Sequence, residues 1–374
     1  MFAIIAPGQG SQTPGMLAGW LRDPVYAERV RAWSEAADVD LVHLGTRAPA
    51  AEIARTEHTQ PLLVAQGVLA HEALAPAAAG RTVVAAGHSV GELTAAVYAG
   101  VLTPVDAVRL AAIRGRAMAA ACAEAPTSMA AVVGGTEAEV LARIAGLGLT
   151  AATFNGPGQI VAAGLTADLE RLAAAPPPGA TVKPLAVAGA FHTPYMESAR
   201  QAFAAAAEAT RFAPPRGLLL SNADGEVLAT PEVIRRRLVE QVVRPVRWNL
   251  CLLGLARLAP GLTVSLPPAK TLTAILRRQH PELAVLPVGS ARDIGKVHAR
   301  LTTTAPTLAT PTATAPTHTA PTLATPTATA PTHTAPTPVT PTATAPTTPA
   351  ADTEAPAAPA APAARKEEPA HAGV

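Results

Sequence analysis

The chain has 374 residues, of which 49% are hydrophobic but only 3% aromatic, and its formal net charge is +2. This mildly basic balance, without a concentrated stripe of Lys and Arg, argues against a protein that binds nucleic acid. The two cysteines, Cys122 and Cys251, support neither a disulfide framework nor a zinc site, and no leader or long apolar run is visible, so a cytoplasmic protein without a membrane segment is expected.

The first hundred residues alternate between short apolar runs and helical patterns. Residues 2–6 are predicted as a buried strand, followed by the loop PGQGSQTPGM. Helical patterns at 24–39 and 60–74 come before a second predicted strand at 82–86. Strands that alternate with helices predict an α/β fold with a mainly parallel sheet.

Between residues 127 and 188 the pattern becomes smaller and self-contained. The predicted elements are a strand at 128–135, a helix at 136–148, a strand pair at 149–156 and 159–164, a helix at 166–175 and a last strand at 180–189. The order β-α-β-β-α-β is typical of a ferredoxin-like unit. We therefore expect a small subdomain, 127–188, inserted into a core made of residues 1–126 and 189–301, with a cleft between them.

The end of the chain is built differently. From residue 304 a fifteen-residue unit, TAPTLATPTATAPTH, occurs twice and is followed by a degenerate copy. Frequent proline removes backbone donors, and the absence of large side chains leaves nothing to bury. Residues 302–374 are predicted to be a disordered tail. The repeated histidines, His318 and His333, could bind a metal weakly, but low-complexity drift explains them better.

The segment GHSVG, residues 87–91, has the pattern GxSxG between the second strand and an alanine-rich helical run that ends near Gly100. In this context the serine occupies a sharp strand-to-helix turn, and the helix N-terminus favours negative charge. Ser89 is therefore a candidate nucleophile, with a purely structural turn as the alternative.

A serine nucleophile needs a base, and histidine is the usual one near neutral pH. His192, in AVAGAFHTPYM, stands where an apolar strand runs into a loop, which is where the site residues of parallel sheets collect. His88 is beside Ser89 and is expected to point to the other side of the turn. The residues alone favour His192 without excluding a different base.

Two arginines interrupt the apolar helical segment AAIRGRAM, residues 111–118. Arg114 and Arg116 are two positions apart, so they point in different directions and at most one faces a site. That one could hold a substrate carboxylate in a bidentate fork, whereas both could instead extend outward into solvent.

Six segments together resemble one family, in its order and at its spacing. They are PGQGSQ at 7–12, GHSVGE at 87–92, IRGRAM at 113–118, NGPGQIVAAG at 155–164, GAFHTPYM at 189–196 and EQVVRPVRW at 240–248. The family is that of malonyl-CoA:acyl carrier protein transacylases and the acyltransferase domains of polyketide synthases. The resemblance covers residues 1–301 and implies an α/β-hydrolase-like core with a ferredoxin-like insertion.

The resemblance also implies a role for each matching residue. Ser89 is the nucleophile and His192 the base, the N–H groups of Gln9 and Val90 form an oxyanion hole, and Arg114 holds the malonyl carboxylate. Further implied site residues are Gln241, whose main-chain carbonyl orients the histidine, Asn155, which lines the cleft, and Phe191, which excludes an α-methyl group.

The activity implied is malonyl transfer from malonyl-CoA to the phosphopantetheine thiol of an acyl carrier protein, by a monomer without a metal or other cofactor. A serine esterase or thioesterase, and an inactive module that docks a carrier protein, are the alternatives. One departure from the family stands at SLPPAK, residues 265–270, where relatives commonly have GPGK. It removes none of the implied chemical groups.

Overall fold

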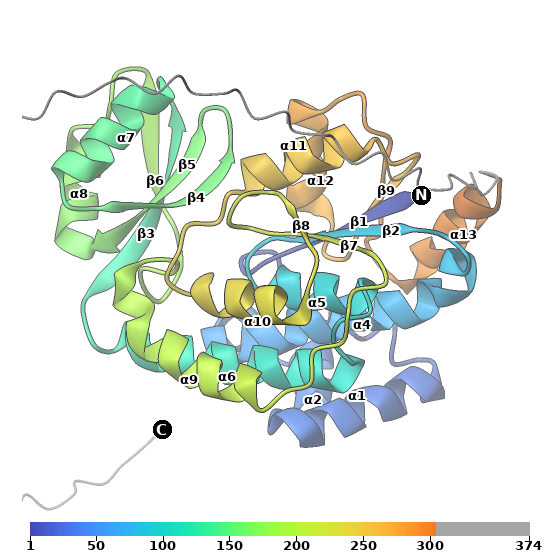
Figure 1. Ribbon diagram of the computed structural model, residues 1–374. Helices are drawn as coiled ribbons and strands as arrows, with labels where there is room; N and C mark the ends of the chain where they lie inside the picture. Colours follow the sequence, from blue (N-terminus) through green and yellow to red (C-terminus); the bar gives the residue numbers. More distant parts are fainter. Residues whose placement is uncertain (304–374) are drawn as a thin grey trace, which may run out of the picture. The chain divides into compact units, whose positions relative to one another are not determined.

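The computed structural model describes residues 1–303, so residues 304–374 of the predicted tail lie outside the described part (Figure 1). Residues 302 and 303, predicted as the start of the tail, instead belong to the last described helix. Its larger sheet has six strands in the order β10-β9-β1-β2-β7-β8. All neighbours are parallel except β7 and β8, which form an antiparallel pair. The strands are β1 (Phe2–Ala6), β2 (Val83–Gly87), β7 (Leu218–Leu220), β8 (Val227–Leu228), β9 (Thr263–Ser265) and β10 (Val285–Pro287). The predicted mainly parallel sheet is confirmed.

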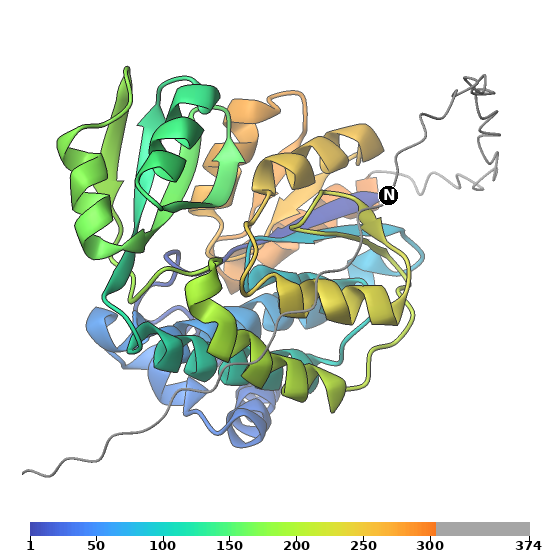
Figure 2. The same cartoon turned by 60° about the vertical axis from the view of Figure 1, so that its left-hand side comes forward.

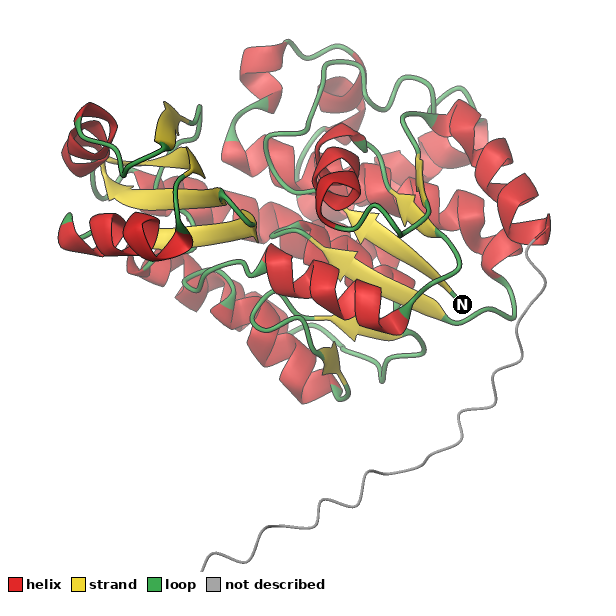
Figure 3. Ribbon diagram, turned by 90° about the horizontal axis from the view of Figure 1, so that it is seen from above, coloured by secondary structure: helices red, strands yellow, loops and turns green. Residues whose placement is uncertain are grey.

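Side chains of β1 alternate between two apolar layers, as the pleat of a strand requires. Phe2 and Ile4 belong to the larger core, and Ala3 and Ile5 to the smaller one, and all four are fully buried. The smaller core contains residues of α11 (Trp248–Leu258) and α12 (Lys270–Gln279). The larger core is filled by α1 (Pro24–Ala37), α2 (Leu41–Thr46), α3 (Ala50–Ile53), α4 (Thr56–Ala78), α5 (Gly91–Tyr98), α6 (Pro104–Cys122), α9 (Glu197–Glu208), α10 (Pro231–Glu240) and α13 (Ile294–Thr303). Helices therefore cover both faces of the sheet (Figure 3).

The second sheet is smaller, antiparallel and set to one side of the first (Figure 2). Its strand order is β4-β5-β3-β6. The elements are β3 (Thr127–Gly134), α7 (Glu137–Gly146), β4 (Thr150–Gly156), β5 (Gln159–Leu165), α8 (Thr166–Ala174) and β6 (Ala180–Pro184). One face packs on α7 and α8, whereas Met129 and Val161 of the other face line a cavity next to Ser89.

The small sheet is joined to the core by main-chain hydrogen bonds in addition to its two chain connections. Phe154 N–H donates to the Val246 carbonyl at 2.9 Å, and Val246 N–H donates to the Ala152 carbonyl at 2.9 Å. Val246 belongs to the segment between α10 and α11, so β4 forms one bridge with the core. This bridge holds the small sheet beside the ends of β1 and β2, where the predicted site residues lie.

Several predicted boundaries are wrong by a few residues. The last strand of the small sheet ends at Pro184 rather than 189, because the chain then makes a tight turn in which the Val187 N–H donates to the Leu185 carbonyl at 2.9 Å. The helix predicted at 24–39 ends at Ala37, since Asp38 adopts a left-handed conformation with φ 53°. The two short helices α2 and α3 were not predicted, and α4 extends beyond 60–74 at both ends.

The described residues contain neither a membrane-spanning helix nor a disulfide bond. Within residues 1–303, no helix combines the length and the apolar character needed to cross a membrane. Both cysteines are free thiols, with Cys251 buried and Cys122 half-buried.

Candidate active site

Ser89 occupies the turn between β2 and α5, as the GxSxG pattern predicts, and its backbone has a φ of 54°. A residue other than glycine in this left-handed region costs about 1–3 kcal/mol, and such strain is concentrated at functional sites. The turn also requires its glycines. A Cβ on Gly87 would lie 2.0 Å from the carbonyl carbon of Gly91, and one on Gly91 would lie 2.5 Å from the Ala6 carbonyl oxygen. The glycines therefore allow the close approach that presents Ser89.

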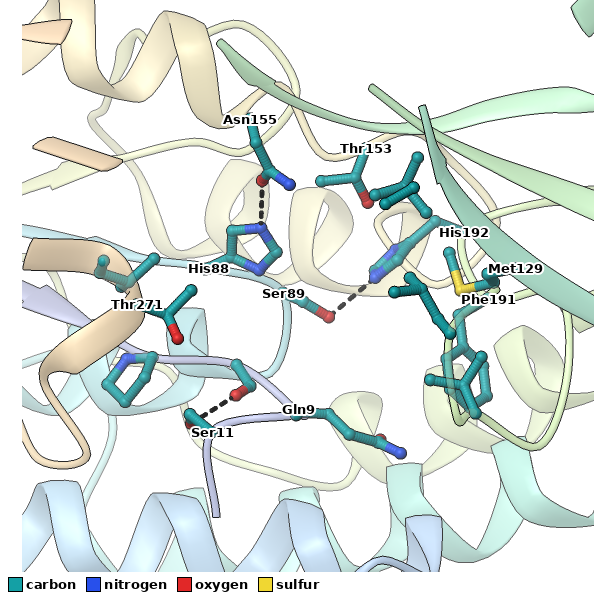
Figure 4. A pocket seen from close by; sticks show the side chains of 18 of the residues that line it. Gln9, Ser11, His88, Ser89, Met129, Thr153, Asn155, Phe191, His192 and Thr271 are labelled. Atoms are coloured by element: carbon teal, nitrogen blue, oxygen red, sulfur yellow. Dashed lines mark hydrogen bonds between the residues drawn. The ribbon is translucent and has the colours of Figure 1, made fainter. Parts of the chain in front are cut away.

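His192 is the histidine whose ring contacts Ser89 Oγ (Figure 4). Its Nε2 lies 2.8 Å from Ser89 Oγ, and its Nδ1 lies 2.8 Å from the main-chain carbonyl oxygen of Gln241. A carbonyl only accepts, so Nδ1 carries the proton and Nε2 is left as the acceptor for the serine O–H. His192 is buried, and burial together with the nearby Arg114 lowers its pKa to about 3. The imidazole is therefore neutral near pH 7 and able to take a proton.

The partner that orients His192 is a peptide carbonyl rather than an acid. Helix α10 ends at Glu240, and Gln241 follows as its C-cap. Carbonyl groups at a helix C-terminus have no partner within the helix, so the Gln241 carbonyl is available to the imidazole. This arrangement brings together two predicted residues from segments 49 positions apart in the chain.

Arg114 is only 2% exposed and contacts the nucleophile from α6. Its Nη1 donates to Gln60 Oε1 at 2.7 Å, and its Nη2 donates to Gln241 Oε1 at 2.8 Å and lies 3.4 Å from Ser89 Oγ. Arg116 points elsewhere and donates to the Ala37 carbonyl at 2.9 Å. The expected divergence of the two arginines is confirmed. Among the described residues, the side chains bonded to Arg114 are neutral.

The acid near Arg114 is Glu92, in the first turn of α5, and it is 3% exposed. Burial raises the pKa of Glu92 to about 8, and burial lowers that of Arg114 to about 10. Near pH 7 the arginine is therefore protonated while the glutamate is mostly neutral. A net positive charge remains beside Ser89, in surroundings with little water.

Gln9 and Val90, the predicted oxyanion donors, flank the serine from two segments. Val90 directly follows Ser89, and Gln9 lies in the loop after β1, which lines the cavity in front of the serine. Within residues 1–303 neither main-chain N–H has a protein acceptor. The side chain of Gln9 is occupied by Thr56, since its Nε2 donates to Thr56 Oγ1 at 3.2 Å.

The cavity in front of Ser89 has a volume of about 250 Å³ and lies between the core and the small sheet. Phe191 and Asn155 both line it, as do Ser89 and His192 (Figure 4). His88 also lines it but, as expected, is not the histidine that contacts Ser89 Oγ. Its Nε2 is 3.0 Å from Asn155 Oδ1, which keeps the ring away from Ser89 Oγ.

Three buried polar residues of the site were not predicted from the sequence: Gln60, Glu92 and Asn222. Asn222 is 1% exposed, accepts from the Ser89 N–H at 2.8 Å and donates to the Gly87 carbonyl at 2.7 Å. It follows β7 at the carboxyl end of the strand, where site residues of parallel sheets gather. Glu92 is an acid in an otherwise apolar helix, a signal that could have been used.

Comparisons with known proteins identify the family of the chain. The family model of the acyl transferase domain matches residues 3–320. A malonyl CoA-acyl carrier protein transacylase of Mycobacterium tuberculosis is 48% identical over 299 residues, which cover 79% of this chain and 99% of the relative.

Two solved structures share the fold. The crystal structure of MCAT from Mycobacterium tuberculosis matches with a TM-score of 0.78 and 48% identity over 79% of this chain and 99% of that chain. A malonyl-transacylase in complex with a type II PKS acyl-carrier protein matches with a TM-score of 0.74 and 29% identity over 80% and 99% of the two chains. The chain therefore belongs to the acyl transferase family, among enzymes related to the malonyl CoA-acyl carrier protein transacylases.

Proposed function

We propose that the protein transfers malonyl from malonyl-CoA to the phosphopantetheine thiol of an acyl carrier protein through a malonyl ester on Ser89. In the first half-reaction, Ser89 Oγ attacks the thioester carbonyl while its proton passes to His192 Nε2. The N–H groups of Gln9 and Val90 hold the oxyanion that forms. The imidazolium then gives its proton to the sulfur of the departing CoA.

The second half-reaction uses the same groups in the reverse sense. His192 takes the proton of the carrier thiol, whose sulfur attacks the malonyl ester, and the imidazolium returns a proton to Ser89 Oγ. Such ping-pong transfer needs no metal or redox cofactor, because the thioester is already activated. A carrier protein as acceptor is supported by the related malonyl-transacylase that was solved with one.

The observation that carries the choice of acyl group is the position of Arg114 Nη2, 3.4 Å from Ser89 Oγ. A buried guanidinium whose partners are two amides and the serine hydroxyl carries an uncompensated charge and can donate two hydrogen bonds to the carboxylate of a malonyl group. It gives no such contact to acetyl or to a longer fatty acyl group. Phe191, on the cavity wall, is proposed to disfavour a methyl branch, an effect of about 1–3 kcal/mol.

Intact-mass spectrometry tests the proposal. We expect a malonyl adduct after incubation with malonyl-CoA, its absence in Ser89→Ala, and its transfer when a carrier protein is added. Release of free malonate instead would identify a hydrolase, the esterase or thioesterase alternative. No adduct at all would leave a module that only docks a carrier protein.

The same proposal includes the division of the chain into an α/β-hydrolase-like core and a small subdomain. The strand order β4-β5-β3-β6 supports a ferredoxin-like subdomain over residues 127–188, inserted into an α/β-hydrolase-like core of residues 1–126 and 189–301. A monomer in the cytoplasm remains a prediction from the sequence. The role proposed for Asn155, to line the cleft from the small subdomain, is supported by its place in the cavity wall.

A further inference from the structure

We propose that the side chain of Gln241, and not only its main-chain carbonyl, is a positioning residue that couples Arg114 to the main chain of Ser89. The inference rests on the proposed function for the identity of the acyl group. It assigns to one amide the task of keeping the carboxylate-binding arginine and the nucleophile turn in a fixed relation.

The contacts of this amide reach three parts of the site. Gln241 is 6% exposed, and its Oε1 accepts from Arg114 Nη2 at 2.8 Å. Its Nε2 donates to the Ser89 carbonyl oxygen at 3.0 Å and to Glu92 Oε2. Asn222 Oδ1 lies 3.3 Å from the same Nε2, so three acceptors share its two hydrogens, with this bond the longest. Together these bonds join α5, α6 and the end of α10.

Only one orientation of the amide fits these partners. The guanidinium of Arg114 is a donor without acceptor capacity, and the Ser89 carbonyl is an acceptor without a proton. A flipped amide would place its NH₂ group against Arg114 and its oxygen against the carbonyl. The hydrogen-bond pattern therefore fixes which end of the Gln241 amide faces each partner.

The bond to the Ser89 carbonyl has a consequence for the adjacent peptide. The peptide unit is planar, so its C=O and N–H point in opposite directions. A donor that holds the Ser89 carbonyl thereby holds the Val90 N–H, the proposed oxyanion donor, facing the other way. The Glu92 N–H also donates to this carbonyl at 3.0 Å, so Gln241 supplies the second of two bonds that set the plane.

Gln60 provides a natural comparison within the same site. It is 1% exposed and its Oε1 accepts from Arg114 Nη1 at 2.7 Å, but its Nε2 donates to the sulfur of Met118 rather than to the nucleophile turn. Loss of Gln60 should therefore disturb Arg114 alone. Loss of the Gln241 side chain should disturb both Arg114 and the oxyanion donor.

Methionine is the replacement of choice at both positions, because it has nearly the length of glutamine without its amide. Alanine would be less suitable, since Gln241 also borders a second cavity of about 640 Å³ that truncation would enlarge. Every variant at position 241 keeps the main-chain carbonyl that orients His192. Gln66→Met is the matched control, because Gln66 is a buried glutamine of α4 whose side chain, among residues 1–303, bonds the Met16 carbonyl at 2.7 Å and no group of the site.

The experiment measures single-turnover acylation of Ser89 by malonyl-CoA and by acetyl-CoA, followed by intact-mass spectrometry. The rate constant reports chemistry at folded sites, and the final fraction acylated reports how much protein is folded. We expect Gln241→Met to slow both acyl groups by about tenfold or more, with the larger loss for malonyl. Gln60→Met should slow malonyl selectively, and Gln66→Met should leave both rate constants unchanged.

Three results of this experiment would overturn the proposed role of the Gln241 side chain. Wild-type rate constants in Gln241→Met would overturn the proposal and leave the main-chain carbonyl as the whole contribution of this residue. Slowing of malonyl alone would overturn the coupling to Ser89. If Gln241→Met does not fold, Gln241→Glu keeps the acceptor for Arg114 and removes the donor, so unslowed acetyl loading there would also overturn it. A wild-type protein that forms no malonyl adduct would instead refute the proposed function.

Discussion

Replacement of Arg114 by alanine is the sharpest test of why this site should select malonyl. The side chain is 2% exposed, and Nη2 lies 3.4 Å from Ser89 Oγ, so a carboxylate bound there would be largely desolvated. Truncating one partner of a buried, hydrogen-bonded charge pair costs about 2–5 kcal/mol. A loss of about 3 kcal/mol corresponds to a decrease of roughly 10²-fold in kcat/KM for malonyl loading.

Acetyl loading should respond differently, because acetyl has no carboxylate to lose a partner. We expect acetylation of Ser89 in Arg114→Ala to be unchanged or faster. The substitution also leaves Oε1 of Gln60 and of Gln241 without their donor, at about 1–3 kcal/mol each, so part of the protein can be unfolded. The rate constants are therefore compared after normalisation to the final fraction of protein that becomes acylated on Ser89, which measures how much of it is folded.

The assay compares single-turnover rate constants for malonyl-CoA and acetyl-CoA in the wild type, Arg114→Ala and Arg116→Ala. The last is the matched control, since Arg116 is on the same helix but bonds the Ala37 carbonyl. We expect its malonyl-to-acetyl ratio to equal that of the wild type. Equal losses for both acyl groups in Arg114→Ala would refute the carboxylate-binding role.

Four further predictions concern other parts of the protein. Phe191→Ser should raise the preference for methylmalonyl relative to malonyl by about 10- to 200-fold, and an unchanged ratio in competition assays would contradict a steric role. Burial and Arg114 lower the pKa of His192 to about 3, so its imidazole stays neutral as the pH falls. The acylation rate should therefore not decline between pH 8 and about 5, and a pH–rate profile with a midpoint near 6.5 would contradict this. Burial raises the pKa of Glu92 from 4.5 to about 8, so between these pH values the folded protein holds a proton that the unfolded chain releases. As the pH rises through this range, the free energy of unfolding of the wild type should fall relative to that of Glu92→Gln by about 1.4 kcal/mol per pH unit. Urea unfolding at several pH values measures that difference, and a constant difference would be evidence against the burial effect. A chain that ends at Thr303, the last residue of α13, should keep the full rate of transfer to a carrier protein, and a large loss would give the remaining residues a role in catalysis.

The sequence was most informative where a local pattern demands a local structure. The strand at Phe2–Ala6 was predicted from a short apolar run that a glycine- and proline-rich loop ends, and the turn at Ser89 from an apolar run, glycines and a helical run that follow one another directly. The divergence of Arg114 and Arg116 also follows from helix periodicity alone. Segment ends were less predictable, since a tight turn after Leu185 or a left-handed Asp38 determines where an element stops.

Tertiary structure decided how these pieces meet. The apolar run before His192 predicts a strand end beside it, whereas β6 stops at Pro184 and His192 lies in the loop beyond. Only the fold brings its ring between Ser89 Oγ and the Gln241 carbonyl. Gln60 looks like an ordinary polar residue of a helix, and although Glu92 is unusual as an acid in an apolar helix, nothing in the spacing relates the two residues to each other. They share a site because buried donors must find acceptors: Gln60 accepts from Arg114, and Glu92 accepts from Gln241. The type of chemistry at Ser89 was thus readable from the sequence, whereas the partners that orient each reacting group depend on contacts between distant segments.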